Sequence, residues 1–297
     1  MATPLEEAPG SLGGRRRLLL KREDLHELGA FKWRGALPAL RHYRERGADA
    51  VVTASTGNHG AATAWAAQRT GLRAVVFGPE GASRSKVAVM EELGAELHLT
   101  GPDLDEAKDR ARAFAAERRL PFFEDGAEPA QFDGYGEIAR ELVEQIGEPP
   151  AAVIVPVGNG ALLVGIAREL PRSERIGVVA KEAPVMALSV AAGHPVPCDR
   201  CATFADGMAV RVAVPLAVAE LAALRVRMVE VSERALARAV GAFDAAGVHV
   251  EGSAAASLAA LESLPDLGEP TVLILTGRNI DDELHRRAVE HPESFSP

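Results

Sequence analysis

Residues 153–162 read VIVPVGNGAL, and this stretch decides the fold class. The apolar run at residues 151–157 predicts a buried strand, the small residues after it predict a tight turn, and the segment running to about Leu170 predicts a helix. Other apolar runs that read as strands occupy residues 17–21, 50–55, 73–78, 95–100, 175–180, 227–231 and 271–276. Amphipathic helical patterns separate most of them, which predicts an α/β protein with mostly parallel twisted sheets flanked by helices.

The turn Gly158–Leu162 predicts an anion-binding site. Glycines let the backbone approach a ligand closely, so that several N–H groups converge on phosphate oxygens. A dinucleotide fingerprint does not fit, because Leu163 occupies the third glycine position of G-x-G-x-x-G. No Gly-Lys-Ser or Gly-Lys-Thr follows, which excludes a P-loop. We therefore expect the phosphate to belong to a group other than a nucleotide.

A second candidate anion site lies in residues 53–60, which read TASTGNHG. They follow the apolar strand at residues 50–52 and open a helix predicted over Asn58–Gln68. The N–H groups at the start of a helix have no intrahelical acceptors, and together with the helix dipole they bind carboxylates or phosphates. The alternative is that Ser, Thr and Asn act here only as ordinary helix N-caps.

Lys32 lies in the segment GAFKWRGA, residues 29–36, at the start of a helix predicted over Phe31–Arg46. A lysine that acts as a covalent catalyst must be partly desolvated and must sit on a rigid element. Its neighbours Ala30, Phe31 and Trp33 are apolar, which favours this role. The alternative is a solvated lysine in the first turn of a helix. The two candidate anion sites favour the interpretation of Lys32 as a reactive lysine.

These motifs, together with TFADG at residues 203–207 and TGRNID at residues 276–281, resemble fold type II pyridoxal-phosphate enzymes of the tryptophan synthase beta superfamily. The resemblance is to the threonine/serine ammonia-lyase (dehydratase) and serine racemase group, and it runs over nearly the whole chain. It implies pyridoxal 5'-phosphate as the cofactor. It also implies two lobes: a small lobe at residues 40–128 and a large, cofactor-binding lobe at residues 1–39 and 129–297.

The resemblance also assigns roles to individual residues. Lys32 would bond covalently to the cofactor, Phe31 would pack on one face of its ring and Gly207 would border the other. Asn58 would hydrogen-bond the ring 3-hydroxyl, and Thr276 would meet the ring nitrogen. The residues expected to hold the cofactor phosphate are Gly158, Asn159, Gly160, Ala161 and Leu162. Those expected around the substrate carboxylate are Ser55, Thr56, Gly57, Asn58 and His59.

The implied reaction converts L-threonine, L-serine or a related β-hydroxy amino acid to a 2-oxo acid and ammonia. Lys32 would remove the α proton, and the cofactor phosphate and a hydroxyl such as that of Ser55 are the candidate donors to the departing hydroxyl. A neutral hydroxyl at Thr276 stabilises a protonated ring nitrogen less than a carboxylate does, which favours elimination. Thr56 has a hydroxyl where racemases of this group carry their second acid, so an amino-acid racemase stays open.

Further alternatives are a β-replacement enzyme of the same fold and an inactive relative that binds an amino acid. A nucleotide-dependent oxidoreductase is disfavoured by Leu163. The chain also departs from the family pattern at Ala30, Ala61, Asn159, Ala161 and Arg278. Asn159 and Ala161 replace glycines, and they keep the turn intact if their φ angles are negative. These departures bear on the substrate more than on the cofactor.

Composition agrees with an enzyme acting on a small amino-acid substrate. The 297 residues are 47% hydrophobic, enough for a large core, and the net charge of -9 argues against nucleic acid as a partner. No apolar stretch is long enough to span a membrane and the first residues do not read as a signal peptide, so we expect no membrane partner and a cytoplasmic location. The resemblance leaves open whether the chain forms a homodimer.

We expect no required metal. Some relatives bind a divalent cation through carboxylates after the strand that corresponds to residues 176–180, but here Lys181 and Glu182 follow, out of register. The only cysteines, Cys198 and Cys201, form a single C-x-x-C in a predicted loop. A zinc site of that type needs a second ligand pair, so neither a zinc site nor a redox motif is expected there.

Overall fold

The computed structural model describes residues 2–13, 16–264 and 267–297. The chain divides into two compact units, which are described separately. The large unit comprises Met1–Phe31 and Tyr135–Pro297, and the small unit comprises Lys32–Gly134.

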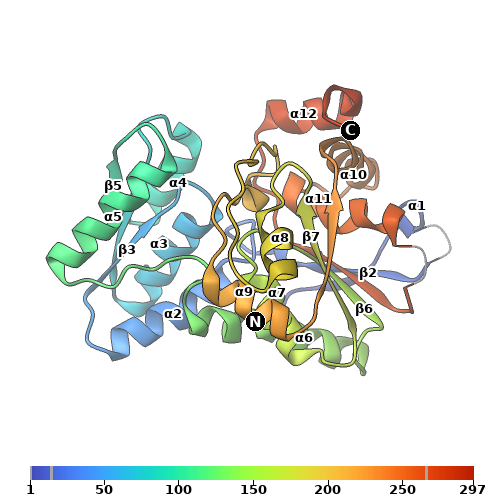
Figure 1. Ribbon diagram of the computed structural model, residues 1–297, viewed down its shortest axis with the longest axis horizontal. Coiled ribbons are helices and arrows are strands. Elements are labelled where there is room, and N and C mark those ends of the chain that lie inside the picture. The colour runs from blue at the N-terminus through green and yellow to red at the C-terminus, as the bar shows by residue number, and fades with distance from the viewer. Residues whose placement is uncertain (1, 14–15, 265–266) are drawn as a thin grey trace. The chain divides into compact units, whose positions relative to one another are not determined.

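The large unit is built on a six-stranded sheet in the order β1-β2-β9-β6-β7-β8 (Figure 1). Its strands are β1 (Leu5–Glu7), β2 (Leu18–Arg22), β6 (Ala152–Pro156), β7 (Glu174–Ala180), β8 (Arg227–Val231) and β9 (Thr271–Leu275). All neighbouring pairs are parallel except β1 and β2. The edge strand β1 was not predicted, because three residues with little apolar character carry no strand signal of their own. It forms by pairing with the buried strand β2.

Helices cover both faces of this sheet. The helices of this unit are α1 (Gly10–Gly13), α6 (Pro129–Ile146), which starts within the small unit, α7 (Ala161–Glu169), α8 (Val185–Ala192), α9 (Pro215–Ala223), α10 (Glu233–Ala245), α11 (Gly252–Ala259) and α12 (Asp282–Glu290), and α12 packs on α10. Short 3-10 turns occur at Glu23–Leu25, Asp206–Met208, Ala260–Ser263 and Pro292–Ser294. Successive side chains of a strand point to opposite faces. Accordingly Ile176 and Val178 join the core beneath α10 and α11, whereas Gly177 faces Leu163 of α7.

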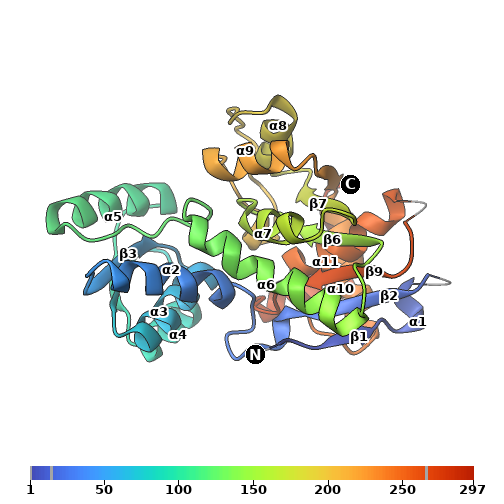
Figure 2. The same cartoon turned by 90° about the horizontal axis from the view of Figure 1, so that it is seen from below.

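The small unit has a three-stranded parallel sheet in the order β3-β4-β5, formed by Ala50–Ala54, Arg73–Gly78 and Glu96–Leu99. Its helices are α2 (Trp33–Glu45), α3 (Asn58–Thr70), α4 (Arg84–Glu92) and α5 (Leu104–Arg118). Helix α5 lies on one side of the sheet and α2, α3 and α4 lie on the other (Figure 2). Ala107, Ala111 and Ala115 of α5 are small enough to pack directly on the strands, and Trp33 meets Trp65 edge-on between α2 and α3.

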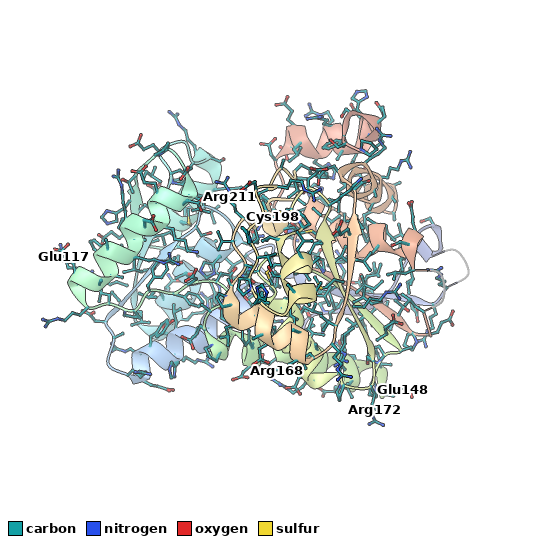
Figure 3. The ribbon with its side chains drawn as sticks, in the orientation of Figure 1. Glu117, Glu148, Arg168, Arg172, Cys198 and Arg211 are labelled. Carbon is teal, nitrogen blue, oxygen red and sulfur yellow. The ribbon has the colours of Figure 1, made fainter. Side chains whose placement is uncertain are left out.

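The predicted α/β class, with two mostly parallel sheets flanked by helices, is therefore confirmed. Cys198 and Cys201 are partly exposed thiols in the loop between α8 and α9, where Figure 3 labels Cys198. Within the described parts of the chain, no helix has both the length and the apolar character needed to cross a membrane.

Candidate active site

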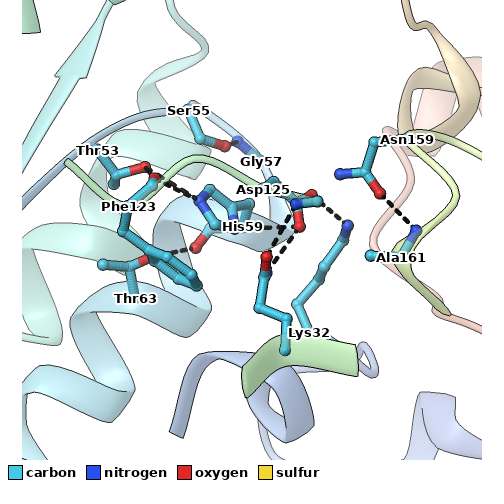
Figure 4. A network of polar contacts seen from close by, with 12 residues as sticks. Lys32, Thr53, Ser55, Gly57, His59, Thr63, Phe123, Asp125, Asn159 and Ala161 are labelled. Atoms are coloured by element: carbon cyan, nitrogen blue, oxygen red, sulfur yellow. Dashed lines mark hydrogen bonds and ion pairs between the residues drawn. The ribbon is translucent and has the colours of Figure 1, made fainter. Parts of the chain in front are cut away.

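Lys32 is the residue immediately before α2, and its amine is held by a carboxylate of the small unit. Lys32 Nζ donates a hydrogen bond of 2.5 Å to Asp125 Oδ2, and the two side chains are 15% and 20% exposed (Figure 4). Gln131 Nε2 donates to the other oxygen, Oδ1, at 3.0 Å. The sequence therefore placed Lys32 correctly at the start of a helix, but it gave no sign that Asp125 is the partner of the Lys32 amine.

The environment keeps Asp125 ionised. Burial alone raises the pKa of its carboxyl group, but the charge of Lys32 and the hydrogen bonds from Lys32 and Gln131 outweigh burial and hold the pKa well below its usual range. Asp125 is thus a carboxylate at neutral pH. Together with Lys32 it forms an ion pair whose amine has little access to bulk water.

His59 lies behind this pair, in the interior of the small unit. Its Nε2 is 3.0 Å from Thr53 Oγ1 and 3.3 Å from the Phe123 carbonyl oxygen, and its Nδ1 is 3.7 Å from Asp125 Oδ1. Burial lowers the pKa of His59, and the opposing effect of Asp125 does not restore it, so the imidazole is neutral near pH 7. The His59 side chain therefore braces Asp125.

The predicted substrate loop connects β3 to α3. Gly57 is the residue before the first helical residue, Asn58, and its N–H donates to Ser55 Oγ at 3.2 Å. A Cβ added at Gly60 would lie 2.8 Å from the Ser55 carbonyl oxygen, so the loop packs tightly on its helix. Ser55 to Asn58 are only partly buried. The structure thus brings these residues together at a helix start, where the helix dipole favours an anion.

The predicted phosphate turn lies between β6 and α7 of the large unit. Gly160 has φ +93°, a conformation that L side chains rarely adopt, and a Cβ added at Gly158 would lie 2.4 Å from the Gly207 carbonyl oxygen. Neither Asn159 nor Ala161 has a positive φ, as the intact turn requires. Asn159 Oδ1 accepts the Ala161 N–H at 3.1 Å, so the side chain that replaces a glycine occupies one donor of the turn (Figure 4).

Phe31 and Thr276, two predicted cofactor residues far apart in sequence, are neighbours in the large unit. The Phe31 N–H donates to the Thr276 carbonyl oxygen at 3.0 Å. The Glu251 N–H donates to the Gly277 carbonyl oxygen at 3.1 Å, and a Cβ added at Gly277 would lie 2.8 Å from Glu251 Oε2. Glu251 therefore lies beside the loop that carries Thr276.

Two buried hydroxyls near this loop have no hydrogen-bond partner within the described residues: Thr276 Oγ1 and Ser253 Oγ. Thr276 is 3% exposed and Ser253 is 4% exposed. Ser253 Oγ would be 2.7 Å from a Cβ at Gly207, so it borders another predicted cofactor residue. A buried hydroxyl left unpaired costs about 1–3 kcal/mol, which a polar ligand atom recovers on binding. This half of the site is thus chemically suited to a ligand with a polar ring and a phosphate, such as pyridoxal phosphate.

Sequence reasoning missed Asp125, Gln131 and Ser253. Asp125 follows the segment Pro121–Phe123, which joins the small sheet only through an isolated bridge from Phe122 to Val52. That segment is too short to show a strand periodicity. Ser253 lies in a helix made mostly of small residues, and nothing in that pattern distinguishes it from its neighbours.

Comparison with known proteins agrees with this geometry. A family model described as "Pyridoxal-phosphate dependent enzyme" matches residues 1–277. L-threonine ammonia-lyase of Geobacter sulfurreducens is 35% identical over 272 residues, which are 89% of this chain and 67% of that protein. The chain spans between 34% and 67% of the length of three of the curated relatives that it matches.

Solved structures give the same result. Threonine deaminase isoform 2 of Solanum lycopersicum, in its processed form, superimposes with a TM-score of 0.91 at 30% identity, covering 98% of this chain and 88% of that one. Maize serine racemase superimposes with a TM-score of 0.86 at 26% identity, covering 98% and 93% of the two chains. This chain therefore belongs to the family of pyridoxal-phosphate-dependent enzymes, in their fold type II.

Proposed function

We propose that the chain is a pyridoxal-phosphate-dependent ammonia-lyase that converts L-threonine, L-serine or a related β-hydroxy amino acid to a 2-oxo acid and ammonia. The names of similar proteins support the substrate class: an L-threonine ammonia-lyase by sequence and a threonine deaminase by structure. The observation that carries the proposal is the buried, unpaired hydroxyl of Thr276.

The Thr276 side chain favours elimination because its hydroxyl carries no negative charge. A carboxylate facing the ring nitrogen would stabilise a protonated, strongly electron-withdrawing ring, whereas a neutral hydroxyl does not. With a weaker electron sink, expulsion of a group from the β carbon is the favoured outcome once the α proton has left. A β-hydroxyl is such a group.

Residues from several segments would hold the cofactor. Lys32 would bond to it covalently, Phe31 and Gly207 would border its ring, Asn58 would bond its 3-hydroxyl and Thr276 would face its nitrogen. The turn Gly158–Leu162 would hold the phosphate through backbone N–H groups. When bound, pyridoxal phosphate withdraws electrons from the α carbon of the amino acid.

Lys32 would then act as the base that takes the α proton. The Asp125 carboxylate, 2.5 Å from Nζ, stabilises the ammonium form that Lys32 acquires in that step. Gln131 and the neutral His59 hold the carboxylate in place. Asp125 is thus proposed as a positioning residue for the catalytic lysine.

The loop before α3 would orient the substrate. The substrate carboxylate would lie against the backbone N–H groups of the segment Ser55–His59, where the helix dipole favours a negative charge. Fixing the substrate there lowers the entropic part of the barrier. Ser55, whose hydroxyl lies in the same loop, would donate the proton with which the β-hydroxyl leaves as water.

One assay tests the proposal. The purified protein, supplied with pyridoxal phosphate, is incubated with L-threonine and with L-serine, and 2-oxo acid, ammonia and the D-enantiomer are measured together. We expect 2-oxobutanoate and ammonia in equal amounts from L-threonine, with no net oxidation. Absence of any 2-oxo acid from both substrates, in protein with bound cofactor, would contradict the proposal.

Racemisation is the second candidate, because Thr56 places a hydroxyl in the same partly exposed loop as Ser55. A racemase needs an acid on the face opposite the lysine, and Thr56 would supply it. If the chain is mainly a racemase, the assay yields the D-enantiomer faster than 2-oxo acid, and Thr56→Val abolishes that product while leaving elimination in place.

A further inference from the structure

Three side chains outside the mechanism converge in the large unit: Asp244, His249 and His285. Asp244 belongs to the last turn of α10, His249 to the segment between α10 and α11, and His285 to α12. Their possible ligand atoms all lie within 4.8 Å of one another. Helices α10 and α12 pack against each other (Figure 1).

The spacing between His285 and Asp244 suits a bridging ion better than a direct hydrogen bond. Nε2 of His285 is 3.6 Å from Oδ1 of Asp244, longer than the usual hydrogen bond of about 2.9 Å. Two ligands on a tetrahedral ion, each bound at about 2.1 Å, lie about 3.4 Å apart. Nε2 of His285 is also buried and has no hydrogen-bond partner among the described residues.

The second imidazole lies against the first. The ring centroids of His249 and His285 are 4.3 Å apart and their planes are inclined by 39°. Asp244 and His249 are exposed, so their side chains can rotate by the small amount needed to close on an ion.

We propose that Asp244, His249 and His285 bind one Zn²⁺ ion, or a chemically similar divalent transition metal, with water completing the coordination. Two imidazoles and one carboxylate are ligands that Zn²⁺ takes readily, whereas Mg²⁺ and Ca²⁺ prefer all-oxygen sites. The three positions follow no compact sequence motif, since His285 lies 36 positions after His249. Sequence reasoning about metals considered only the reaction and the cysteine pair, and did not reach this cluster.

Such an ion would brace the part of the large unit that shapes the cofactor region. It would join the end of α10 to α12 and fix His249, two residues before the buried Glu251. An ion that binds only the folded chain raises its unfolding temperature by mass action. We therefore expect the ion to stabilise the fold without taking part in the reaction.

Isothermal titration of ZnCl₂ into the untagged, cofactor-loaded protein tests this site. The background carries Cys198→Ser and Cys201→Ser, because exposed thiols also bind zinc. We expect one tight site per chain, at least about tenfold weaker in His285→Ala, His249→Ala and Asp244→Asn, and a rise in unfolding temperature with Zn²⁺ that these variants lose. His291→Ala is the matched control, because His291 is also on the surface beside a carboxylate, 3.4 Å from Glu293, but outside the cluster.

Each outcome decides the proposal. Equal zinc affinity in the parent and in all three cluster variants, or no site in the parent, overturns it. Mg²⁺ binding as tightly as Zn²⁺ overturns the assignment of imidazole ligands. If His285→Ala fails to fold, the exposed Asp244→Asn and His249→Ala variants still give the answer.

Discussion

The polar groups around Lys32 and those around Thr276 are organised in opposite ways. In the small unit, hydrogen bonds and a 3.7 Å approach of His59 to Asp125 link the side chains of Lys32, Asp125, Gln131, His59 and Thr53. In the large unit, the buried hydroxyls of Thr276 and Ser253 have no hydrogen-bond partner among the described residues. The polar side chains around Lys32 are thus partnered within the protein, whereas the two hydroxyls in the Thr276 region would gain partners from a bound ligand.

The largest expected effect is at Lys32, where one substitution removes the catalytic base but keeps a positive charge beside Asp125. Lys32→Arg keeps a cation for Asp125, but a guanidinium does not lose its proton and cannot act as the base. We expect the rate of 2-oxo acid formation to fall about 10³-fold or more. The free energy of unfolding, from urea titration, should change by less than about 1 kcal/mol. Activity within tenfold of the parent would remove Lys32 from the mechanism.

Asp125→Asn removes the charge and keeps the shape. The ammonium form of Lys32 then loses its stabilising anion, so kcat should fall about 10²-fold. The free energy of unfolding should fall by about 2 kcal/mol, because a hydrogen bond between charged groups is lost in a partly buried site. The control is Asp109→Asn, an aspartate 80% exposed and 3.9 Å from Arg112, whose loss should cost less than about 0.5 kcal/mol. Equal effects of the two variants would show that Asp125 is an ordinary surface partner.

Gly158→Ala tests the large unit. The added Cβ would lie 2.4 Å from the Gly207 carbonyl oxygen, so one backbone segment must move. We expect cofactor affinity to fall at least about tenfold and the free energy of unfolding to fall by about 1–3 kcal/mol. Gly241 lies within α10, and a Cβ added there would have no neighbour nearer than 3.7 Å. Gly241→Ala should therefore raise the free energy of unfolding by about 0.5–1 kcal/mol. Unchanged cofactor binding in Gly158→Ala would remove the turn from the phosphate site.

The smallest effects are expected from replacing one buried threonine by valine in each unit. These two variants also compare the two units most directly. Thr53→Val removes the partner of the Phe123 carbonyl oxygen and of His59, and should lower the free energy of unfolding of the cofactor-free protein by about 1–3 kcal/mol. Thr276→Val removes a hydroxyl that has no hydrogen-bond partner among the described residues. It should leave the free energy of unfolding of the cofactor-free protein unchanged or raise it. Titration with pyridoxal phosphate should show about tenfold weaker binding in Thr276→Val only. Similar destabilisation by both variants would remove the contrast between the units.

Features encoded by local sequence were predictable. The apolar runs at residues 50–55 and 227–231 correspond to β3 and β8, and the helix predicted over Asn58–Gln68 is observed as Asn58–Thr70. Lys32 also stands at the start of its helix, as expected. Each of these depends on residues within one element, so periodicity and glycine placement are sufficient to find them.

Features that depend on pairing between distant segments were not predictable. Asp125 lies 93 residues from Lys32, and no local pattern links the two. His59 illustrates the same limit, since its position in the loop was clear but the direction of its side chain depends on Thr53 and Phe123. The unpaired state of Thr276 Oγ1 likewise follows from packing of the large unit, not from the strand that precedes it.

The central claim is that Lys32 carries the cofactor. Borohydride reduction of the cofactor-loaded protein, followed by proteolysis and mass spectrometry, measures which lysine bears the pyridoxyl group. We predict a single labelled peptide in which the modification lies on Lys32, and no such label in Lys32→Arg. A label on another lysine, or a protein that remains unlabelled at saturating pyridoxal phosphate, would contradict the account.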